Sequence, residues 1–598
     1  MGYNALRPIA RVRQGSISGT MPVVGVNLRD FPQLLDTNNA LYIENYWVDS
    51  QAKLVKRSGS ALYFDTGDSD LIRVCAEYQN GYEIEAHGTK LRARNVSSGA
   101  FTNIKTDYTS GGVFDGVRTG DYFFVTHNLN GLYRISMTVT YSASVAFVAG
   151  EKVTGSGGGT AIVLEVSGGT LTLGSIRGSF QNGDTITGNA SGAGTLTSGV
   201  TFTATHISSA PKAKYIAYDG KRLWLYNLTT DPAGWSYSAA DTGANPPFTT
   251  WTTTSSFEGG GSGTYRNGEQ ANSIIFIGDV NFIALEKGWT AFSIAQTDSA
   301  GVISKYEQLV QTSDLGIKKA AMTDAGMIAV GEWGVKRLIS IGQPNIPYSE
   351  QWESLTEQIG EDYFDDVNFD NASITYNSKR GYLYVACAKG GGTTNNFILA
   401  IKLDIAGVES KTVTGATSFF TGLNPYRLFT IDNEIYFSSS LDGEVYHLFV
   451  GEQDSGQNIY TEYYQELNFG EVIGQLNLDD MSIFGEFSSE SSLEVSFDTF
   501  NEDSHFVNSV ATYTWQPYND YSSGGGWGGS AWSSSAWGAS GSGSGLTYDK
   551  ADLRPRLRNV MRVRIRFSSQ DASDHTLNMF TAKASITGQS RSHKLTQA

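Results

Sequence analysis

The sequence lacks most of the features that mark secreted, membrane-spanning or disulfide-bonded proteins. Its 598 residues include only two cysteines, Cys75 and Cys387, and each lies in an apolar, strand-like run. Two distant cysteines of this kind are typically buried free thiols, which predicts a chain folded in a reducing compartment. The N-terminus has no signal-peptide pattern, and no apolar run reaches about 18 residues. Neither secretion nor a membrane-spanning segment is therefore indicated.

Charge is also scarce, and it is mostly of one sign. Charged residues make up 17% of the chain, and acidic residues outnumber basic ones by 60 to 43, giving a formal net charge of −17. A surface of this sign argues against nucleic-acid binding by overall attraction. It suits a soluble protein, or a passage along which a polyanion slides without sticking.

Glycine and aromatic residues, in contrast, are abundant. The chain has 68 glycines against 12 prolines, and 12% of its residues are aromatic, a composition typical of turn-rich all-β proteins. The clearest hairpin is Tyr215–Asn227, in which two apolar runs flank Asp219-Gly220, a pair that suits a tight turn. Seven such hairpins have turn centres near residues 81, 120, 220, 279, 326, 380 and 433.

Short-strand units that recur at roughly 40–50 residues indicate the blades of a β-propeller. We therefore predict an all-β fold, a β-propeller of six or seven blades, with a run of unrelated β-sandwiches as the alternative. The expected order is an N-terminal arm (1–40), first blades (41–142), an inserted β module (143–203), remaining blades (204–455) and a C-terminal β-sandwich-like domain (456–598).

The insertion contains an internal duplication with an offset of 33 residues. Phe147, the segment 150–155 and Gly159 match Phe180, the segment 183–188 and Gly192. Two such copies can pair into a small β-barrel or sandwich that stands out from a blade. The module has little charge and no candidate catalytic residue, so we interpret it as a docking or decorating module.

Motifs for catalysis and for cofactor or metal binding are missing. The seven histidines show no HExxH or Cys/His spacing, and no GxSxG, Walker A or GxGxxG in a βαβ setting occurs. The acids Asp65, Asp68 and Asp70 resemble a calcium loop only superficially, because the glycine at its sixth position and the glutamate at its twelfth are absent. We therefore expect no enzyme activity, no catalytic residue, no cofactor and no metal.

The sharpest local pattern lies near the C-terminus, between residues 554 and 567. Arginines occupy even positions and apolar residues occupy odd ones, so that a strand would carry an arginine ladder on one face. Like charges in a row repel, so acids should lie opposite. Three sources of negative charge are possible: nearby acids of the same chain such as Glu486, Glu494 and Asp498, acids of a neighbouring subunit, or DNA phosphates. The arginines are Arg554, Arg556, Arg558, Arg562, Arg564 and Arg566.

A Gly/Ser-rich loop (522–545) precedes this ladder and carries Trp527, Trp532 and Trp537. Such a composition does not pack by itself. The loop is therefore either a mobile tip or a set of aromatic side chains that contact a partner.

One passage near the N-terminus resembles a known family. Tyr46-Trp47-Val48-Asp49, followed by Leu-Val-Lys-Arg-Ser-Gly at 54–59, looks like the opening of tail hub, or nozzle, proteins of short-tailed, podovirus-type bacteriophages. It is similar to the packaged-DNA stabilisation proteins of that group. The hairpins and the basic segment before Leu577–Ile586 also resemble these proteins, in outline over residues 40–140 and 205–590. The insertion and the tryptophan-rich loop depart from the simplest members, so no role is carried over to them.

The resemblance implies a structural virion protein of a phage tail, made and assembled in the host cytoplasm. It implies a homohexameric ring that extends the portal–adaptor channel, retains packaged DNA and conducts it during ejection. The implied partners are the tail adaptor above, needle, fibre or spike proteins beside or below, and genomic DNA that passes without sequence-specific binding.

In such a ring the arginine ladder would join subunits, and an acidic cluster would face the lumen and repel DNA phosphates. The cluster comprises Glu361, Asp362, Asp365 and Asp366. Two alternatives remain: a stand-alone propeller that binds or hydrolyses glycans, and a receptor-binding tail component. The second is disfavoured because the sequence has no long repetitive fibre tract.

Overall fold

The computed structural model describes most of the chain, with gaps. The described residues are 13–20, 25–26, 39–48, 53–241, 248–251, 261–264, 269–277, 280–286, 288–297, 303–312, 316–338, 352–356, 361–403, 416–466, 476–487, 491–500, 506–515, 547–560, 562–571 and 575–586. Strands dominate these ranges, and no helix within them is long and apolar enough to cross a membrane.

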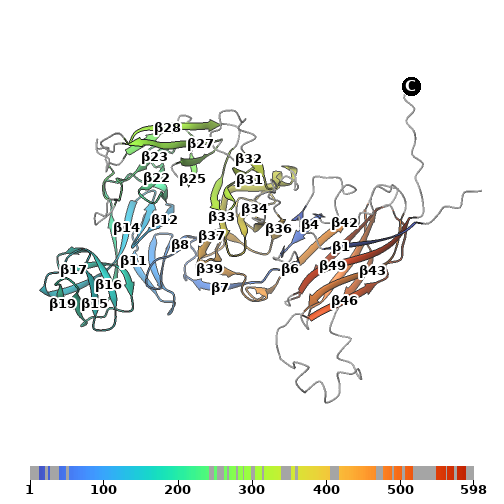
Figure 1. Cartoon of the computed structure of the whole chain (residues 1–598), viewed down its shortest axis with the longest axis horizontal. Helices are drawn as coiled ribbons and strands as arrows, with labels where there is room; N and C mark the ends of the chain where they lie inside the picture. The colour runs from blue at the N-terminus through green and yellow to red at the C-terminus, as the bar shows by residue number, and fades with distance from the viewer. Residues whose placement is uncertain are drawn as a thin grey trace, which may run out of the picture.

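Seven four-stranded blades stand around a common axis and form a β-propeller (Figure 1). Blade 1 consists of β8 (Ile72–Glu77), β9 (Tyr82–His87), β10 (Lys90–Asn95) and β11 (Phe101–Lys105). Blade 2 consists of β12 (Phe114–Thr119), β13 (Tyr122–His127), β14 (Gly131–Val145) and β20 (Thr201–His206). Blade 3 consists of β21 (Ala213–Tyr218), β22 (Leu223–Leu228), β23 (Gly234–Tyr237) and β24 (Gly261–Thr264).

Blades 4 to 7 complete the ring. Blade 4 has β25 (Ala271–Ile277), β26 (Val280–Leu285), β27 (Trp289–Thr297) and β28 (Ile303–Thr312), and blade 5 has β29 (Lys319–Thr323), β30 (Gly326–Gly331), β31 (Gly334–Leu338) and β32 (Trp352–Ser354). Blade 6 has β33 (Val367–Asn377), β34 (Tyr382–Lys389), β35 (Phe397–Lys402) and β36 (Ala416–Phe420). Blade 7 has β37 (Pro425–Ile431), β38 (Glu434–Ser439), β39 (Glu444–Leu448) and β7 (Ser60–Asp65).

The first strands of the blades lie at the axis, where most of them contact the first strand of the next blade; between blades 3 and 4, β22 contacts β25, and β37 contacts β8 to close the ring. A strand from the N-terminal side of the propeller sequence also helps to close the ring. β7, which precedes blade 1 in sequence, pairs with β39 as the outer strand of blade 7, with Phe64 opposite Val445. The propeller therefore holds strands from both ends of its sequence in one sheet, which leaves no open blade edge at the closing point.

The seven predicted hairpins are the two innermost strands of the seven blades, so the prediction of a propeller is confirmed and the blade number is seven. The turn in blade 3 differs from the expected two-residue turn. It spans four residues, because Tyr218 pairs with Leu223. The Asp219 carboxylate accepts hydrogen bonds from the backbone amides of Lys221 and Arg222, at 2.7 and 2.6 Å, and so stabilises the longer turn.

Apolar side chains fill the space between neighbouring blades. Trp224 of blade 3 contacts Phe276 of blade 4, with ring centroids 6.1 Å apart, and Phe282 of blade 4 contacts Trp352 of blade 5 at 5.9 Å. Each sheet is covered on both faces, which is why inner strands such as β13 and β22 are buried along their whole length. The core therefore lies as a series of layers around the axis.

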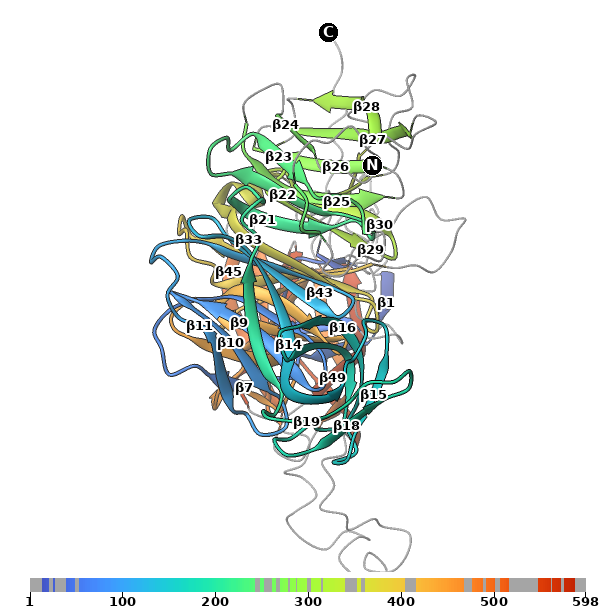
Figure 2. The same ribbon diagram turned by 90° about the vertical axis from the view of Figure 1, so that its left-hand side faces the viewer.

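The insertion forms a closed barrel, as one of the two predicted arrangements (Figure 2). Its strands are β15 (Lys152–Gly155), β16 (Thr160–Ser167), β17 (Thr170–Arg177), β18 (Thr185–Gly188) and β19 (Ala193–Leu196). The far half of β14 pairs with both β17 and β19 and closes the circle. Thr154 lies opposite Thr187, its equivalent in the other copy, so the duplication produces an internal two-fold axis between β15 and β18.

The C-terminal domain lies to one side of the propeller (Figure 1) and is a two-sheet sandwich with a shared apolar core. One sheet has β46 (Thr547–Leu553), β43 (Leu476–Phe487), β49 (His575–Ile586), β6 (Leu54–Lys56) and β5 (Tyr46–Val48), with β1 (Arg13–Thr20) beside β49 and β47 (Leu557–Val560) beside β43. The other has β4 (Tyr42–Glu44), β42 (Thr461–Glu466), β48 (Arg562–Ser569), β44 (Leu493–Phe500) and β45 (Phe506–Trp515).

Two boundaries differ from the predicted domain order. Residues 42–56, which were expected to begin the first blade, belong to the C-terminal sandwich through β4, β5 and β6. Part of the predicted N-terminal arm, β1, also joins this sandwich by pairing antiparallel with β49. Both differences have the same cause: β1, β4 and β6 pair with strands more than 400 residues later, a relationship that no local pattern encodes, and β5 follows through its pairing with β6.

Candidate functional site

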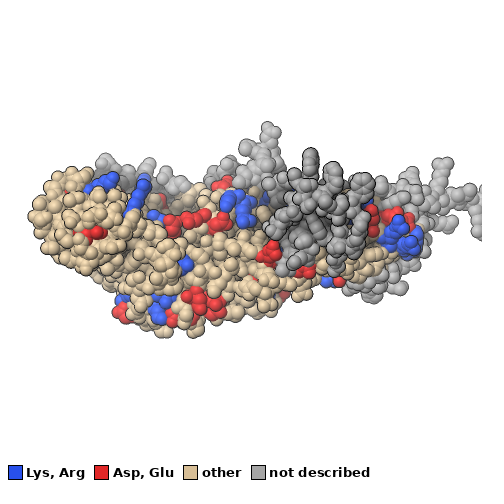
Figure 3. Space-filling model, turned by 90° about the horizontal axis from the view of Figure 1, so that it is seen from below, with Lys and Arg blue, Asp and Glu red and all other residues tan. Residues whose placement is uncertain are grey.

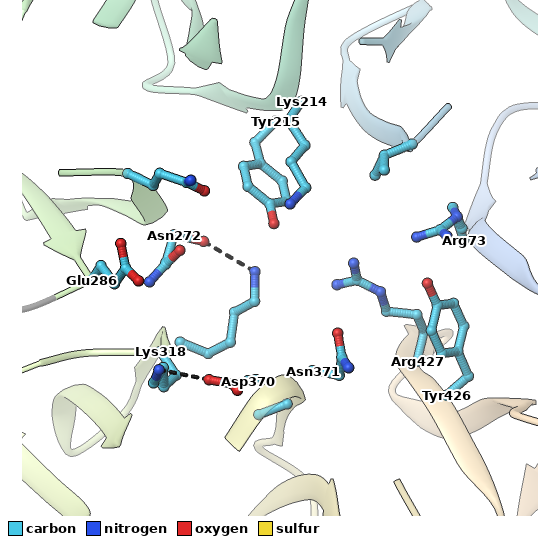
Figure 4. A pocket seen from close by; sticks show the side chains of 14 residues that line it. Arg73, Lys214, Tyr215, Asn272, Glu286, Lys318, Asp370, Asn371, Tyr426 and Arg427 are labelled. Carbon is cyan, nitrogen blue, oxygen red and sulfur yellow. Dashed lines mark hydrogen bonds and ion pairs between the residues drawn. The ribbon is translucent and has the colours of Figure 1, made fainter. Parts of the chain in front are cut away.

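A polar cavity lies on the propeller axis, where the innermost strands of all seven blades begin (Figure 4). It has a volume of about 390 Å³ and includes Arg73 of β8, Tyr215 of β21 and Arg427 of β37 in its lining. A second cavity of about 440 Å³ lies against the middle parts of the same strands. The two cavities share Arg73, Tyr215, Lys319 and Arg427, so they form one channel along the axis.

Four basic side chains from four different blades converge on the first cavity: Arg73, Lys214, Lys319 and Arg427. They are arranged around two tyrosine rings. The guanidinium groups of Arg73 and Arg427 lie 5.4 and 5.7 Å from the ring centroid of Tyr426. The ammonium groups of Lys214 and Lys319 lie 5.3 and 4.6 Å from that of Tyr215. We call these four residues the channel cations.

The channel cations have no carboxylate partner. Within the described ranges, none of the four forms a salt bridge, whereas the neighbouring Lys318 pairs with Asp370 at 2.6 Å. Lys319 donates a hydrogen bond from Nζ to the backbone oxygen of Asn272, at 3.0 Å. The acid further along the channel, Asp115, accepts a hydrogen bond from the backbone N–H of Ile216 at 3.0 Å. Among the described residues, no direct ion pair therefore neutralises the positive charge at the cavity, and Asp115 interacts with Lys319 and Arg427 only at longer range.

The surroundings of the channel cations lower the pKa of two groups, the Lys319 ammonium and the neighbouring Tyr215 hydroxyl. Burial lowers the pKa of Lys319, because removal from water disfavours the ammonium form. Burial by itself would raise the pKa of the Tyr215 hydroxyl, but Lys319, Lys214 and Arg427 together outweigh it and hold that pKa below its ordinary value. A site in which even a phenol is drawn toward ionisation favours negative charge.

No local motif in the sequence marks these residues. In the order Arg73, Lys214, Lys319 and Arg427, successive residues are separated by 141, 105 and 108 positions. A usable signal does exist, because Arg73, Lys214, Lys319 and Arg427 each lie within the first three residues of an innermost strand. Alignment of the seven hairpins by their turns would have placed all four at one end of the channel.

The passage that carries the family resemblance forms the junction between propeller and sandwich. Arg57 is fully buried and pairs with Asp454, with 2.9 Å between Nη1 and Oδ1. Its Nε donates to Oδ1 of Asn45 at 2.7 Å, and its Nη2 donates to the backbone oxygen of Thr421 at 3.1 Å. Gly59 packs so tightly that an added Cβ would lie 2.0 Å from the backbone oxygen of Gln453. A side chain at this position is therefore excluded.

The other residues of this passage bind one body or the other. The Tyr46 hydroxyl contacts Nε2 of His575 in the sandwich at 2.6 Å, and Lys56 donates to the backbone oxygen of Asp571 at 2.5 Å. On the propeller side, the backbone of Val48 exchanges hydrogen bonds with the Tyr382 hydroxyl, both at 2.9 Å. The junction is also a continuous sheet, since β36 of blade 6 pairs with β4.

The arginine ladder is divided between two sheets instead of lying on one strand. Arg554 and Arg556 lie between β46 and β47, Arg558 lies on β47, and Arg562, Arg564 and Arg566 lie on β48. The strand is interrupted at Pro555-Arg556, where Arg556 has a φ of 49°. The predicted alternation is nevertheless present, because Leu557, Val563, Ile565 and Phe567 are buried.

Acids of the same chain lie beside several of these arginines. Arg558 pairs with Asp479 at 2.6 Å, Arg566 with Glu462 at 2.6 Å, and Arg554 lies 3.8 Å from Asp480. Of the three acids expected from the sequence, Asp498 lies opposite Arg564 in the register of β44 and β48, Glu494 lies opposite Ser568, and Glu486 pairs with Lys53. The role of the ladder in joining subunits stays a prediction.

The remaining predicted residues are distributed as follows. The acidic cluster falls on the 3-10 helix η2 (Glu361–Asp366), where Asp365 and Asp366 are exposed and Phe364 is buried; the side chains of Glu361 and Asp362 lie outside the described residues. Trp527, Trp532 and Trp537 also lie outside them. Asp68 pairs with Lys90 at 2.7 Å and with His87 at 2.9 Å. Cys75 and Cys387 are buried and unpaired, as predicted.

Known proteins resemble this chain only distantly. The sequence matches no protein-family model and no curated protein. Among solved structures, the chain is similar to Hsv2 of Kluyveromyces lactis (11% identity, 59% of this chain and 97% of that chain, TM-score 0.24). It is also similar to a putative 6-phosphogluconolactonase of Bacteroides fragilis (11% identity, 67% and 92%, TM-score 0.29). The propeller assignment rests on the strand pairing and ring closure described above.

Proposed function

We propose that the chain is a structural subunit of a bacteriophage tail hub or nozzle, in which six copies form a ring that continues the portal–adaptor channel. In this proposal the propeller supplies a rigid wall element and the C-terminal sandwich supplies subunit contacts. The ring retains packaged DNA and lets it pass during ejection.

The observation that carries the proposal is the position of the resembling passage. Val48 and Arg57 bind the propeller side of the junction, Tyr46 and Lys56 fix the passage within the sandwich, and Gly59 is required there by close backbone contact. The passage on which the resemblance rests thus lies at the junction and contacts both the propeller and the sandwich. A wall that resists the pressure of packaged DNA needs a junction that does not bend, and a buried ion pair within a continuous sheet is suited to that demand.

The surface charge supports a conducting role over a binding role. The chain carries a net charge of −17, and the face seen in Figure 3 has basic and acidic side chains in small mixed groups without a long basic stripe. Proteins that hold DNA by its phosphates need clustered lysine and arginine on the contact surface. A ring of such subunits repels the passing polyanion, which keeps the path open.

Substitution of the arginines on β48 tests the proposal at the subunit contact. Arg562→Glu combined with Arg564→Glu is expected to prevent ring assembly on the tail adaptor, as seen in electron micrographs. Arg118→Glu reverses the charge of a half-exposed blade 2 residue near Glu77 and serves as the matched control, with rings expected to persist. Both proteins are first compared by circular dichroism to verify folding. Intact rings from the folded double variant would contradict the proposed subunit contact.

A further inference from the structure

The channel cations have a chemistry that neither the propeller fold nor the proposed ring uses. We propose that the propeller channel is a binding site for a small molecule that carries a phosphate group, held by Arg73, Lys214, Lys319 and Arg427. The proposal is independent of the phage-tail proposal, because the site lies within one chain and needs no neighbouring subunit.

The first argument is charge balance. The cavity is lined by five cations against two carboxylates, Glu286 and Asp370, and Asp370 already pairs with Lys318. Asp115 of the adjoining cavity adds a third carboxylate to the channel, so the five cations still exceed the acids. Elsewhere this acidic chain neutralises its buried cations directly, as Arg94 is by Glu83 at 2.9 Å. At the channel, tyrosine rings take the place of carboxylates, and a ring face attracts a cation much less strongly than a full negative charge does. A bound anion supplies the missing charge.

The second argument is the direction of the donors. Arg73, Lys214, Lys319 and Arg427 come from blades 1, 3, 5 and 7, so they approach the cavity from all sides of the axis. Figure 4 shows Arg73, Lys214 and Arg427 reaching toward the same space. A phosphate group presents three or more acceptor oxygens in a tetrahedral arrangement, whereas a carboxylate presents two in one plane. Donors arranged around an axis therefore match phosphate better than carboxylate.

The third argument concerns the rest of the ligand. A volume of about 390 Å³ lies within the range of small-molecule sites, about 300–1,000 Å³, and exceeds the needs of inorganic phosphate. Asn272 and Asn371 line the cavity and donate from Nδ2 to the backbone oxygens of Ile317 and Thr393. Among the described residues no donor reaches their side-chain oxygens, which are suited to accept hydrogen bonds from hydroxyl groups. This favours a phosphorylated polyol, such as a hexose phosphate.

Isothermal titration calorimetry on the full chain, at constant ionic strength, tests the proposal. The probes are inorganic phosphate, glucose 6-phosphate, glucose and citrate. We expect saturable binding of the hexose phosphate with one site per chain, weaker binding of inorganic phosphate, and no binding of glucose. Absence of binding by both phosphate probes, or citrate binding as tightly as either, would overturn the assignment.

Matched variants locate the site. Arg427→Gln and Arg73→Gln remove cations from two different blades, and each should weaken hexose phosphate binding about tenfold or more, as expected for the loss of a hydrogen bond to a charged group. Lys221→Gln removes an exposed cation from the blade 3 turn and should change the affinity less than about twofold. Thermal unfolding without ligand shows which variants are folded, and two blades are used so that one folded variant suffices. Unchanged affinity in a folded channel variant would place the binding elsewhere and refute the proposal.

Discussion

Arg57 and Asp454 lie 397 residues apart in the sequence and form an ion pair at the junction of propeller and sandwich, where the arginine side chain is completely buried. Ser60 donates a further hydrogen bond to Oδ1 of Asp454 at 2.9 Å, and Asn45 accepts one from Arg57 at 2.7 Å. The pair therefore belongs to a network in which each charged group is satisfied. Its position makes it the point at which the two bodies are held in a fixed relationship.

Removal of one partner of this pair should destabilise the protein strongly. Asp454→Asn leaves the Arg57 charge buried without its counterion, and breaking a buried pair in this way costs about 3–5 kcal/mol. The free energy of unfolding is measured by urea denaturation monitored by tryptophan fluorescence. Arg554→Met removes an exposed arginine 3.8 Å from Asp480 and should cost less than about 1 kcal/mol. Similar losses for the two variants would mean that the junction pair has no special role.

The two copies within the barrel should respond alike to equivalent substitutions. An added Cβ at Gly192 would lie 2.1 Å from the Phe147 ring, and one at Gly159 would lie 2.4 Å from the backbone oxygen of Ser179 and 2.9 Å from the Phe180 ring. We expect Gly192→Ala and Gly159→Ala each to destabilise the barrel by about 1–3 kcal/mol through overpacking. Gly199→Ala, with its nearest contact at 3.4 Å, is the control and should be nearly neutral. Resistance of the barrel to limited proteolysis reports the difference, and an unaffected Gly192→Ala protein would contradict the packing described.

Acidification should destabilise blade 2 through His127. Burial lowers the pKa of this imidazole to about 4, with smaller contributions from Arg73 and Lys212, and its Nδ1 accepts a hydrogen bond from the Asn130 backbone at 3.1 Å. The unfolded chain takes up a proton near pH 6.5, whereas the native chain does so only near pH 4. Stability is therefore lost as the pH falls from about 6.5 to 4, by about 1.4 kcal/mol for each unit of the pKa shift.

The measurement is the free energy of unfolding between pH 7 and 4 for the native sequence and for His127→Gln. Glutamine keeps an acceptor but cannot become charged, so the difference in pH slope isolates the histidine. The variant should lose less stability over this range. Parallel pH profiles would show that His127 does not titrate differently in the two states.

The purified protein should not bind duplex DNA at physiological salt. With a net charge of −17, long-range electrostatics oppose association, and the channel cations lie inside a cavity of about 390 Å³ that does not admit a duplex. A gel-shift titration at about 0.15 M salt should therefore show free DNA throughout. Tight binding that weakens steeply with salt would indicate a basic contact surface and contradict a conducting role.

The parts of this fold that could be predicted are the local ones. Each innermost hairpin is encoded by two apolar runs and a turn, so all seven could be read from the sequence, and the 33-residue duplication predicted the paired module. The strands β4, β6 and β7 could not be assigned in this way, because each has a partner hundreds of residues away, and β5 joins its sheet through β6. The same reason hid the channel cations, since four isolated basic residues on four strands become a cluster only when the ring closes. The arginine pattern predicted burial correctly but missed the break at Pro555-Arg556 between β46 and β47, and the change of sheet between Val560 of β47 and Arg562 of β48.

The central claim is the ring, and its most direct test is the mass and shape of the purified protein, alone and with a tail adaptor complex. Light scattering gives the mass, and negative-stain electron microscopy gives the shape. The account predicts particles of six chains, each of 64.7 kDa, with an open central hole, either in solution or on the adaptor. A protein that stays monomeric in both conditions, and that instead binds glycans on an array, would contradict the tail-hub proposal.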